Sequence, residues 1–199
     1  GPLTTNFAEA GGFIKSDAGE ALPDLQLHFV VGKLVDHGRA TVFGHGFSCH
    51  VCVLRPQSRG SVRLASKDPL AAPLIDPAFL QEGDDVRRLV KGFKQMRAIL
   101  SQPALAKRGG REKSFDVRSD AEIEALIRQH ADTIYHPVGS CRMGRGPQDV
   151  VDERLCVRGI ERLRVVDASV MPSVPAGNTN APTVMIAERA AEWMRRARA

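Results

Sequence analysis

His136 lies in the densest run of unusual residues in the chain. The run spans residues 135 to 144 and reads YHPVGSCRMG. Pro137 restricts His136 to an extended backbone, and the glycines of the run allow turns or a close approach of the backbone to a ligand. A histidine held in this way can present its ring to a pocket as a proton acceptor. Taken alone, the local sequence favours a hydrogen-bonded structural histidine over a catalytic one.

A second cluster combines a carboxylate with the start of a helix. Residues 163 to 172 read LRVVDASVMP, which indicates a buried strand that ends at Asp167. Residues 177 to 183 read GNTNAPT and precede a helical pattern. A loop that leads into a helix presents backbone N–H groups and the positive end of the helix dipole to an anionic ligand. The alternative is a plain strand, loop and helix with Asn180 as the N-cap.

Helical patterns supply part of the framework for these clusters. Between residues 84 and 100, apolar side chains recur at helical spacing and basic side chains occupy the other side. The apolar residues are Val86, Leu89, Val90, Phe93 and Met96, and the basic ones are Arg87, Arg88, Lys91 and Lys94. A second helix is predicted to begin at Ser119, where Ser119 and Glu122 form a capping box. A third is predicted from Pro182 to about Arg196.

Strand patterns dominate the first third of the chain. Apolar and polar residues alternate from 25 to 31, and a second run extends from 47 to 54. Residues 61 to 66 alternate again, which predicts a third strand of the same antiparallel sheet, with one face solvated. Short β-like pieces follow at 155–158 and 163–166. The sequence therefore predicts an α+β fold with an antiparallel sheet covered by helices.

Composition sets wide limits on function. The chain has 199 residues, is 43% hydrophobic and 26% charged, and has a mean hydropathy of −0.19, so one or two globular units are expected. A net charge of +5 permits a nucleic-acid or acidic-membrane partner without requiring one. No apolar run approaches the roughly 18 residues of a membrane helix. Four cysteines are few for a secreted disulfide scaffold, so a reducing, cytoplasmic compartment is expected.

Cys49 and Cys52 form a possible zinc or redox motif, CHVC. In a strand, however, residues three apart point to opposite faces, so the two sulfurs diverge. No second cysteine pair at ligand spacing exists to complete a tetrahedral site. Haem attachment is excluded because Val53, and not histidine, follows Cys52. No metal site is expected.

A serine hydrolase is another alternative, since the chain contains the residue types of its triad. The candidates are Ser140, Ser169, His136 and Asp167. No Gly-x-Ser-x-Gly elbow is present, and serines near a histidine are frequent by chance. We therefore do not expect a hydrolase.

Residues 87 to 113 are rich in basic side chains, nine against the single acid Glu112. Nucleic-acid binding would also need aromatic side chains on which bases stack, and the stretch contains only Phe93, on the apolar side of the predicted helix. The stretch is more typical of a solvated helix face followed by a basic loop. No nucleic-acid partner is expected.

Together, several segments of the chain resemble the glucose-methanol-choline (GMC) flavoprotein oxidoreductases, in particular their choline dehydrogenase and alcohol dehydrogenase members. They are residues 6–13 (NFAEAGGF), 49–52 (CHVC), 56–60 (PQSRG), 135–144, 165–169 (VVDAS) and 177–183 (GNTNAPT). They occur in the family order and cover nearly the whole chain.

The resemblance extends to the C-terminal portion of the family only. Its Gly-x-Gly-x-x-Gly turn, which holds the FAD pyrophosphate, has no counterpart, since residues 44 to 49 (GHGFSC) lack the third glycine. The resemblance implies that residues 1–21 connect to a missing N-terminal half and that 22–149 form the substrate-binding domain. Residues 150–199 would then add the terminal strand and helix of a Rossmann-like FAD-binding domain. The chain alone is expected to be inactive.

The resemblance also implies roles for individual residues. His136 matches the active-site histidine of the family, and Asn180 matches the second member of the catalytic pair, which is Asn or His. Asp167 and Ala168 match the segment along the flavin. The residues that match the part near its pyrimidine edge are Asn180, Ala181, Pro182 and Thr183. The implied reaction is the oxidation of a primary alcohol to an aldehyde, with hydride transfer to flavin N5 of FAD.

Substrate and partners are less constrained by the resemblance. Choline recognition needs an aromatic cage or a carboxylate, and the chain has one Trp, Trp193, and one Tyr, Tyr135, which favours an uncharged aliphatic or aromatic alcohol. The electron acceptor is open between oxygen and a membrane quinone, and a quinone would bring a cytoplasmic enzyme to the inner membrane face. The alternative class is a non-enzymatic ligand-binding module that retains the family fold. The oligomeric state is not indicated.

Overall fold

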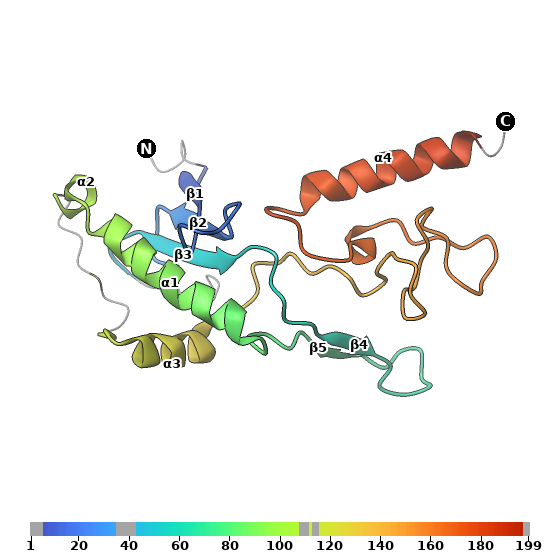
Figure 1. Ribbon diagram of the computed structural model, residues 1–199, viewed down its shortest axis with the longest axis horizontal. Helices are drawn as coiled ribbons and strands as arrows, with labels where there is room; N and C mark the ends of the chain where they lie inside the picture. The colour runs from blue at the N-terminus through green and yellow to red at the C-terminus, as the bar shows by residue number, and fades with distance from the viewer. Residues whose placement is uncertain (1–5, 35–42, 108–111, 113–115, 197–199) are drawn as a thin grey trace. The chain divides into compact units, whose positions relative to one another are not determined.

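The computed structural model describes residues 6–34, 43–107, 112 and 116–196, which divide into two compact units. Unit 1 comprises Gly1–Leu54 and Glu82–Asp132, and unit 2 comprises Arg55–Gln81 and Thr133–Ala199. Figure 1 labels the strands and the α-helices of both units. All the candidate catalytic and flavin-binding residues lie in unit 2. The expected domain division near residues 22 and 149 follows the family pattern and stays a prediction.

Unit 1 contains a three-stranded antiparallel sheet in the order β1-β2-β3. The strands are β1 (Ala10–Ile14), β2 (Leu25–Val30) and β3 (Ser48–Val53). The alternation predicted for residues 25 to 31 is confirmed only at the start of β2, where Leu25 and Leu27 are buried and Gln26 between them is less so. It is wrong at the end, where Val30 is buried and Val31 is exposed. The glycine-rich β1 carries no alternating pattern, and the sequence did not indicate it.

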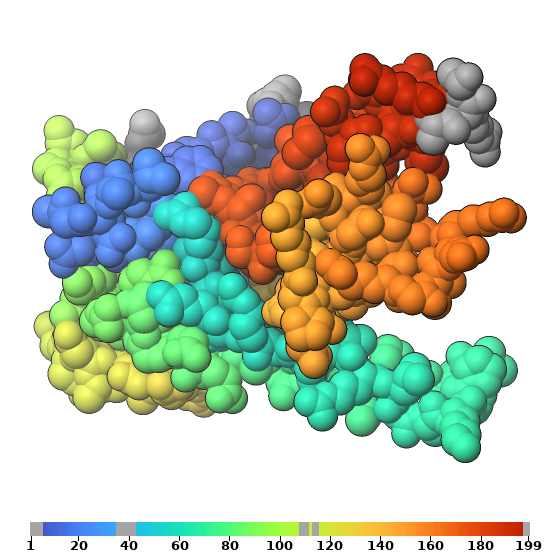
Figure 2. Space-filling view, turned by 45° about the vertical axis from the view of Figure 1, so that its right-hand side comes forward, coloured from blue at the N-terminus to red at the C-terminus, as the bar shows by residue number. Residues whose placement is uncertain are grey.

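One helix packs on this sheet, and a second helix packs on the first. Helix α1 (Gly83–Leu100) packs on β2 and β3, and also on α3 (Asp120–His130). Figure 2 shows α1 in green and α3 in yellow side by side. The predicted capping box is confirmed, since the Ser119 hydroxyl accepts from the Glu122 N–H and the Glu122 carboxylate accepts from the Ser119 N–H. A short α2 (Pro103–Ala106) follows α1.

Arg88 was predicted on the solvated side of α1, but the structure shows that it is buried. Its guanidinium donates to the Leu54 carbonyl at 3.0 Å and to the Asp85 carboxylate at 2.8 Å. Asp24, 1% exposed, lies 4.0 Å from it and accepts both the N–H and the hydroxyl of Ser16. A buried charge is tolerated only when it is paired in this way. The apolar spacing of the helix says nothing about these acids, so it could not predict that Arg88 would be buried.

Unit 2 contains little regular structure. β4 (Ser61–Arg63) and β5 (Leu74–Asp76) form their own two-stranded antiparallel ladder, so the prediction of 61–66 as a third strand of the main sheet is wrong. The β-like pieces 155–158 and 163–166 are joined by one isolated bridge, between Cys156 and Arg164. The helical elements are η3 (Ala168–Val170) and α4 (Asn180–Arg196). The core of the unit consists of Val151, Leu155, Val170 and Ala190, with Ile186 and Trp193 packed against it.

We expect Gly92→Val to destabilise unit 1, because α1 approaches the sheet closely at this position. A Cβ on Gly92 would lie 2.8 Å from Val51 Cγ2 and 2.9 Å from Leu25 Cδ1. Overpacking of this kind costs about 1–3 kcal/mol in the free energy of unfolding, which urea denaturation measures. Gly83→Val is the matched control in the same helix, since nothing lies within 4 Å of its Cβ. Equal losses in the two variants would contradict close packing at Gly92.

Candidate functional site

The imidazole of His136 is held by two consecutive residues that precede α4. Its Nδ1 lies 2.9 Å from Thr179 Oγ1, and its Nε2 lies 2.9 Å from Asn178 Nδ2. His136 and Thr179 are half-buried, whereas Asn178 is exposed. Both ring nitrogens therefore have a hydrogen-bond partner, and one of these partners faces solvent. Such a ring can exchange one partner for a ligand without losing the other.

The backbone around His136 is tightly folded. Tyr135, directly before it, has a φ of 64°, a left-handed conformation that non-glycine residues rarely adopt. Gly139 has a φ of 88°, where glycine meets no steric penalty. Unusual backbone conformations cluster at functional sites, where the surrounding structure maintains them.

Backbone hydrogen bonds connect the histidine run to the segment around η3. The Cys141 N–H donates to the Ser169 carbonyl at 3.1 Å, and the Met143 N–H donates to the Val170 carbonyl at 2.8 Å. The Gly144 N–H donates to the Val151 carbonyl at 3.1 Å. Val151 and Val170 are both fully buried. The two predicted clusters, far apart in sequence, are thus fixed side by side on the core of unit 2.

Asp167 caps η3, with its carboxylate turned toward its own segment. Its Oδ1 accepts from the Ser169 N–H at 2.7 Å and from the Ser169 hydroxyl at 2.5 Å. Asp167 is exposed and Ala168 is half-buried. The capping shows how the segment keeps its shape and why an aspartate suits this position.

Helix α4 begins at Asn180, so Asn180 is its first residue and not the N-cap, which corrects the alternative assignment. The Thr179 carbonyl accepts from the Thr183 N–H at 3.1 Å and from the Thr183 hydroxyl at 2.7 Å. Asn180 and Ala181 are exposed. The first N–H groups of a helix have no acceptor within the helix, and Pro182, which has no N–H, suits the first turn. The start of α4 therefore presents the positive end of the helix dipole.

The sequence placed His136 and Asn180 in one catalytic pair, but His136 bonds to the two residues just before Asn180. No hydrogen bond joins His136 to Asn180 in the described part of the chain. Sequence reasoning did not single out Asn178 or Thr179, although both lie in the GNTNAPT loop. Their side-chain chemistry could have identified them, because an amide and a hydroxyl directly before a candidate catalytic residue can both form hydrogen bonds to an imidazole.

A turn that follows the histidine run is closed by Asp149. Its carboxylate accepts from the Gly146 N–H at 2.7 Å and pairs with Arg142. The hydrogen bond from Arg142, with the further bond from Gly146, lowers the pKa of the Asp149 carboxyl below its ordinary value. The carboxylate thus stays charged at neutral pH and keeps the turn closed.

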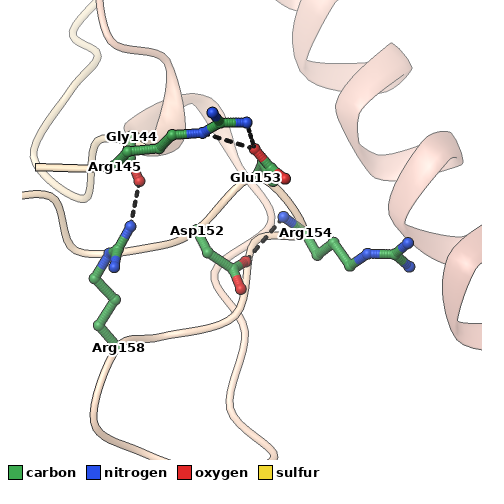
Figure 3. Close-up of a pocket in the computed structure, with 6 residues that line it drawn as sticks. All are labelled: Gly144, Arg145, Asp152, Glu153, Arg154 and Arg158. Atoms are coloured by element: carbon green, nitrogen blue, oxygen red, sulfur yellow. Dashed lines mark hydrogen bonds and ion pairs between the residues drawn. The ribbon is translucent and has the colours of Figure 1, made fainter.

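A shallow hollow of about 350 Å³ lies beyond this turn and contains none of the predicted site residues. Figure 3 shows its lining, in which Arg145 pairs with Glu153 at 2.8 Å and Arg158 donates to the Gly144 carbonyl. Asp152 accepts from the backbone N–H of Arg154 at 2.8 Å. One ion pair and two hydrogen bonds to the backbone hold these side chains, and none of the predicted site residues lines the hollow, so it carries no catalytic assignment.

Cys49 and Cys52 lie on β3 and are partly buried. Burial raises the pKa of both thiols, which disfavours the thiolate that a metal would require. Cys52 Sγ is 3.8 Å from His28 Nε2. Within the residues that the structure describes, no group of three or more His, Cys, Asp or Glu side chains is arranged to hold a metal ion.

Several basic residues of the stretch that begins at residue 87 are paired with acids of unit 1. Lys91 lies 2.7 Å from Asp17, and Arg97 lies 2.7 Å from Glu112. Arg87 and Lys94 pair with Asp84 and Asp120. Residues 108–111 and 113–115 of this stretch lie outside the described part of the chain.

No helix within the described ranges is both long enough and apolar enough to cross a membrane.

Comparison with known proteins gives a consistent result. Residues 56–187 match the GMC oxidoreductase family model, in its C-terminal domain. An alcohol dehydrogenase [acceptor] from Pseudomonas putida is 52% identical over 194 residues, and an oxygen-dependent choline dehydrogenase from Chromohalobacter salexigens is 45% identical over 193. Each alignment covers 96% of this chain and 35% of the relative. The chain therefore spans about a third of the length of these relatives.

The fold agrees with a solved structure. The crystal structure of pyridoxine 4-oxidase from Mesorbium loti superposes with a TM-score of 0.83 at 31% sequence identity. The match covers 96% of this chain and 38% of that one. The described arrangement of small antiparallel sheets and helices is thus shared with a protein of known structure.

We expect Gly139→Ala to loosen the histidine run. An alanine at a φ of 88° costs about 1–2 kcal/mol, and its Cβ would lie 3.4 Å from the Met171 carbonyl. Gly159→Ala is the matched control, with a φ of 78° and nothing within 4 Å. Both variants should lose stability, but only Gly139→Ala should speed hydrogen exchange at the amides of Cys141 and Met143. Faster exchange at these amides in both variants, or in neither, would contradict the expected role of Gly139.

Proposed function

The chain belongs to the GMC oxidoreductase family, and on that premise we propose that it is part of an FAD-dependent oxidoreductase that acts on CH–OH groups. The observation that carries the proposal is the position of His136 at the start of α4. The imidazole lies beside a helix N-terminus, within the segment that matches the family. A proton acceptor next to a site that favours negative charge is what alcohol oxidation requires.

The oxidation of a primary alcohol removes a proton from oxygen and a hydride from carbon. In the proposed reaction, His136 accepts the hydroxyl proton, and Asn180 supplies a second hydrogen bond to the same oxygen. Bound FAD supplies the acceptor for the hydride. The product is the aldehyde, and the proton stays on the imidazole until it is released to solvent.

The residues proposed to contact the flavin fit an electron-rich ring. They are Asp167, Ala168, Asn180, Ala181, Pro182 and Thr183. The exposed first turn of α4 presents N–H groups without an intrahelical acceptor, next to the positive end of the helix dipole. These features favour the negative charge of a reduced flavin. We further propose that residues 150–199, with α4, complete a Rossmann-like FAD-binding domain and that 22–149 form the substrate-binding domain.

The proposed substrate is an uncharged aliphatic or aromatic primary alcohol, with choline as the alternative. Trp193 packs against the core of unit 2 and its ring lies under the Arg189 guanidinium, at 5.5 Å. Trp193 is therefore already occupied and does not belong to a cage for an ammonium group. The identity to the alcohol dehydrogenase, 52%, is also higher than the 45% to the choline dehydrogenase.

We expect His136→Ala to slow flavin reduction by about 10²-fold or more, because the general base is lost. The measurement is anaerobic bleaching of the flavin by a panel of alcohols, including choline, in the full-length protein. His45→Ala is a matched control, since His45 is an exposed histidine of unit 1. Equal rates for His136→Ala and the wild type would exclude His136 as the base, whereas the absence of bleaching by every alcohol would favour a non-enzymatic binding module instead. The alcohol that bleaches the flavin fastest identifies the substrate class.

A separate expectation concerns the chain by itself. Residues 1–199 have no Gly-x-Gly-x-x-Gly turn for the FAD pyrophosphate, so the purified chain should retain no stoichiometric flavin. The absorbance spectrum near 450 nm, compared with the protein concentration, measures the flavin content. A yellow chain with flavin in a 1:1 ratio would show that the pyrophosphate site is dispensable.

A further inference from the structure

The partners of His136 determine which ring nitrogen carries the proton. Asn178 Nδ2 is an amide nitrogen, which donates hydrogen bonds and cannot accept them. In this arrangement His136 Nε2, 2.9 Å away, is the acceptor of the amide N–H. A neutral imidazole has one protonated nitrogen, so the proton is on Nδ1 and is donated to Thr179 Oγ1, also at 2.9 Å.

We propose that Thr179 is a positioning residue that fixes His136 in the Nδ1–H tautomer, so that Nε2 is the atom that accepts the alcohol proton. This inference rests on the proposed function and adds to it the direction of the proton transfer. Thr179 does not touch the substrate in this proposal. It acts through the imidazole, because the hydrogen bond at one ring nitrogen determines which nitrogen carries the proton.

The position of Thr179 is well suited to this task. Its carbonyl is anchored to the first turn of α4 by the N–H and the hydroxyl of Thr183. Its own hydroxyl, half-buried, is thus held at a defined distance from the helix start. A fixed acceptor restrains both the orientation of the ring and the choice of tautomer.

Asn178 shows where the alcohol would bind. Its amide N–H donates to Nε2 from an exposed side chain, and an alcohol O–H is the same kind of donor. The hydroxyl can therefore replace the amide at Nε2 at little cost. In the proposed oxidation the proton would move to Nε2 as the O–H bond breaks, bound FAD would supply the acceptor for the hydride of the C–H bond, and the aldehyde C=O would form. The imidazolium keeps its Nδ1–H bond to Thr179, now charge-assisted and stronger.

The test compares Thr179→Val with Thr179→Ser in the full-length flavoprotein. Valine has the shape of threonine but no hydroxyl, whereas serine keeps the acceptor. We expect the rate constant of anaerobic flavin reduction to fall about 10-fold or more in Thr179→Val, because a half-buried N–H loses its partner. Thr179→Ser should stay within about 3-fold of the wild type, since its hydroxyl preserves that bond. Equal rates in the two variants would overturn the inference.

A second pair of variants changes the hydrogen-bond partner of His136 Nε2. Asn178→Asp replaces a donor by a carboxylate, which accepts only and draws a proton onto Nε2. Asn178→Ala removes the donor without adding an acceptor. We expect Asn178→Asp to reduce its flavin about 10-fold more slowly than Asn178→Ala, because a protonated Nε2 cannot accept the alcohol proton. This pair decides the question if Thr179→Val fails to fold or to bind flavin, and equal rates would overturn the inference.

His136→Ala, measured in the same experiment, separates this inference from the proposed function. A slow His136→Ala with a fast Thr179→Val would remove only the role of Thr179. A fast His136→Ala would remove His136 as the base, and with it the role of Thr179. A wild type that no alcohol bleaches would remove the proposed function itself. Flavin content and the thermal unfolding temperature of each variant show whether a slow rate reflects lost chemistry or lost structure.

Discussion

The candidate site depends on the backbone pairing between the histidine run and the segment around η3. Unit 2 has few regular elements, so its buried N–H and carbonyl groups must find partners one by one. The carbonyls of Ser169, Val170 and Val151 provide three of these partners, for the N–H groups of Cys141, Met143 and Gly144. Val151 and Val170 are also fully buried apolar residues of the core. The same residues thus supply both the apolar packing and the acceptors, which explains how an irregular segment holds a histidine in place.

The sequence predicted well those elements whose signals are local. The helical period of α1 and the capping box of α3 depend on residues three or four apart, and the structure confirms both. The partner of β4 could not be predicted in this way, because strand pairing is decided by distant segments. The alternation at 61–66 is real, yet β4 pairs with β5, whose residues are all exposed and show no pattern. The burial of Arg88 was missed in part for the same reason, since the Leu54 carbonyl that accepts from its guanidinium lies 34 positions away in sequence.

The candidate site shows the same division between local and distant information. The run at 135–144 and the loop at 177–183 were visible as unusual residue types, and the family resemblance assigned His136 and Asn180. The bonds to Asn178 and Thr179 were not predicted, because 42 and 43 positions separate them from His136. Only the folded chain shows which member of a polar loop reaches the ring. A motif therefore identified the segment, and the geometry identified the side chains within it.

Three consecutive residues connect the imidazole to the helix dipole. Asn178 and Thr179 bond to the two ring nitrogens, and Asn180 is the first residue of α4. Because both ring nitrogens are bonded, rotation of the ring about its Cβ–Cγ bond would break two hydrogen bonds at once. The Thr179 carbonyl is in turn part of the first helical turn, so a displacement of α4 would also displace His136. In the proposed reaction, the group that receives the proton and the helix end that stabilises negative charge would consequently stay in register, which is the preorganisation that electrostatic catalysis requires.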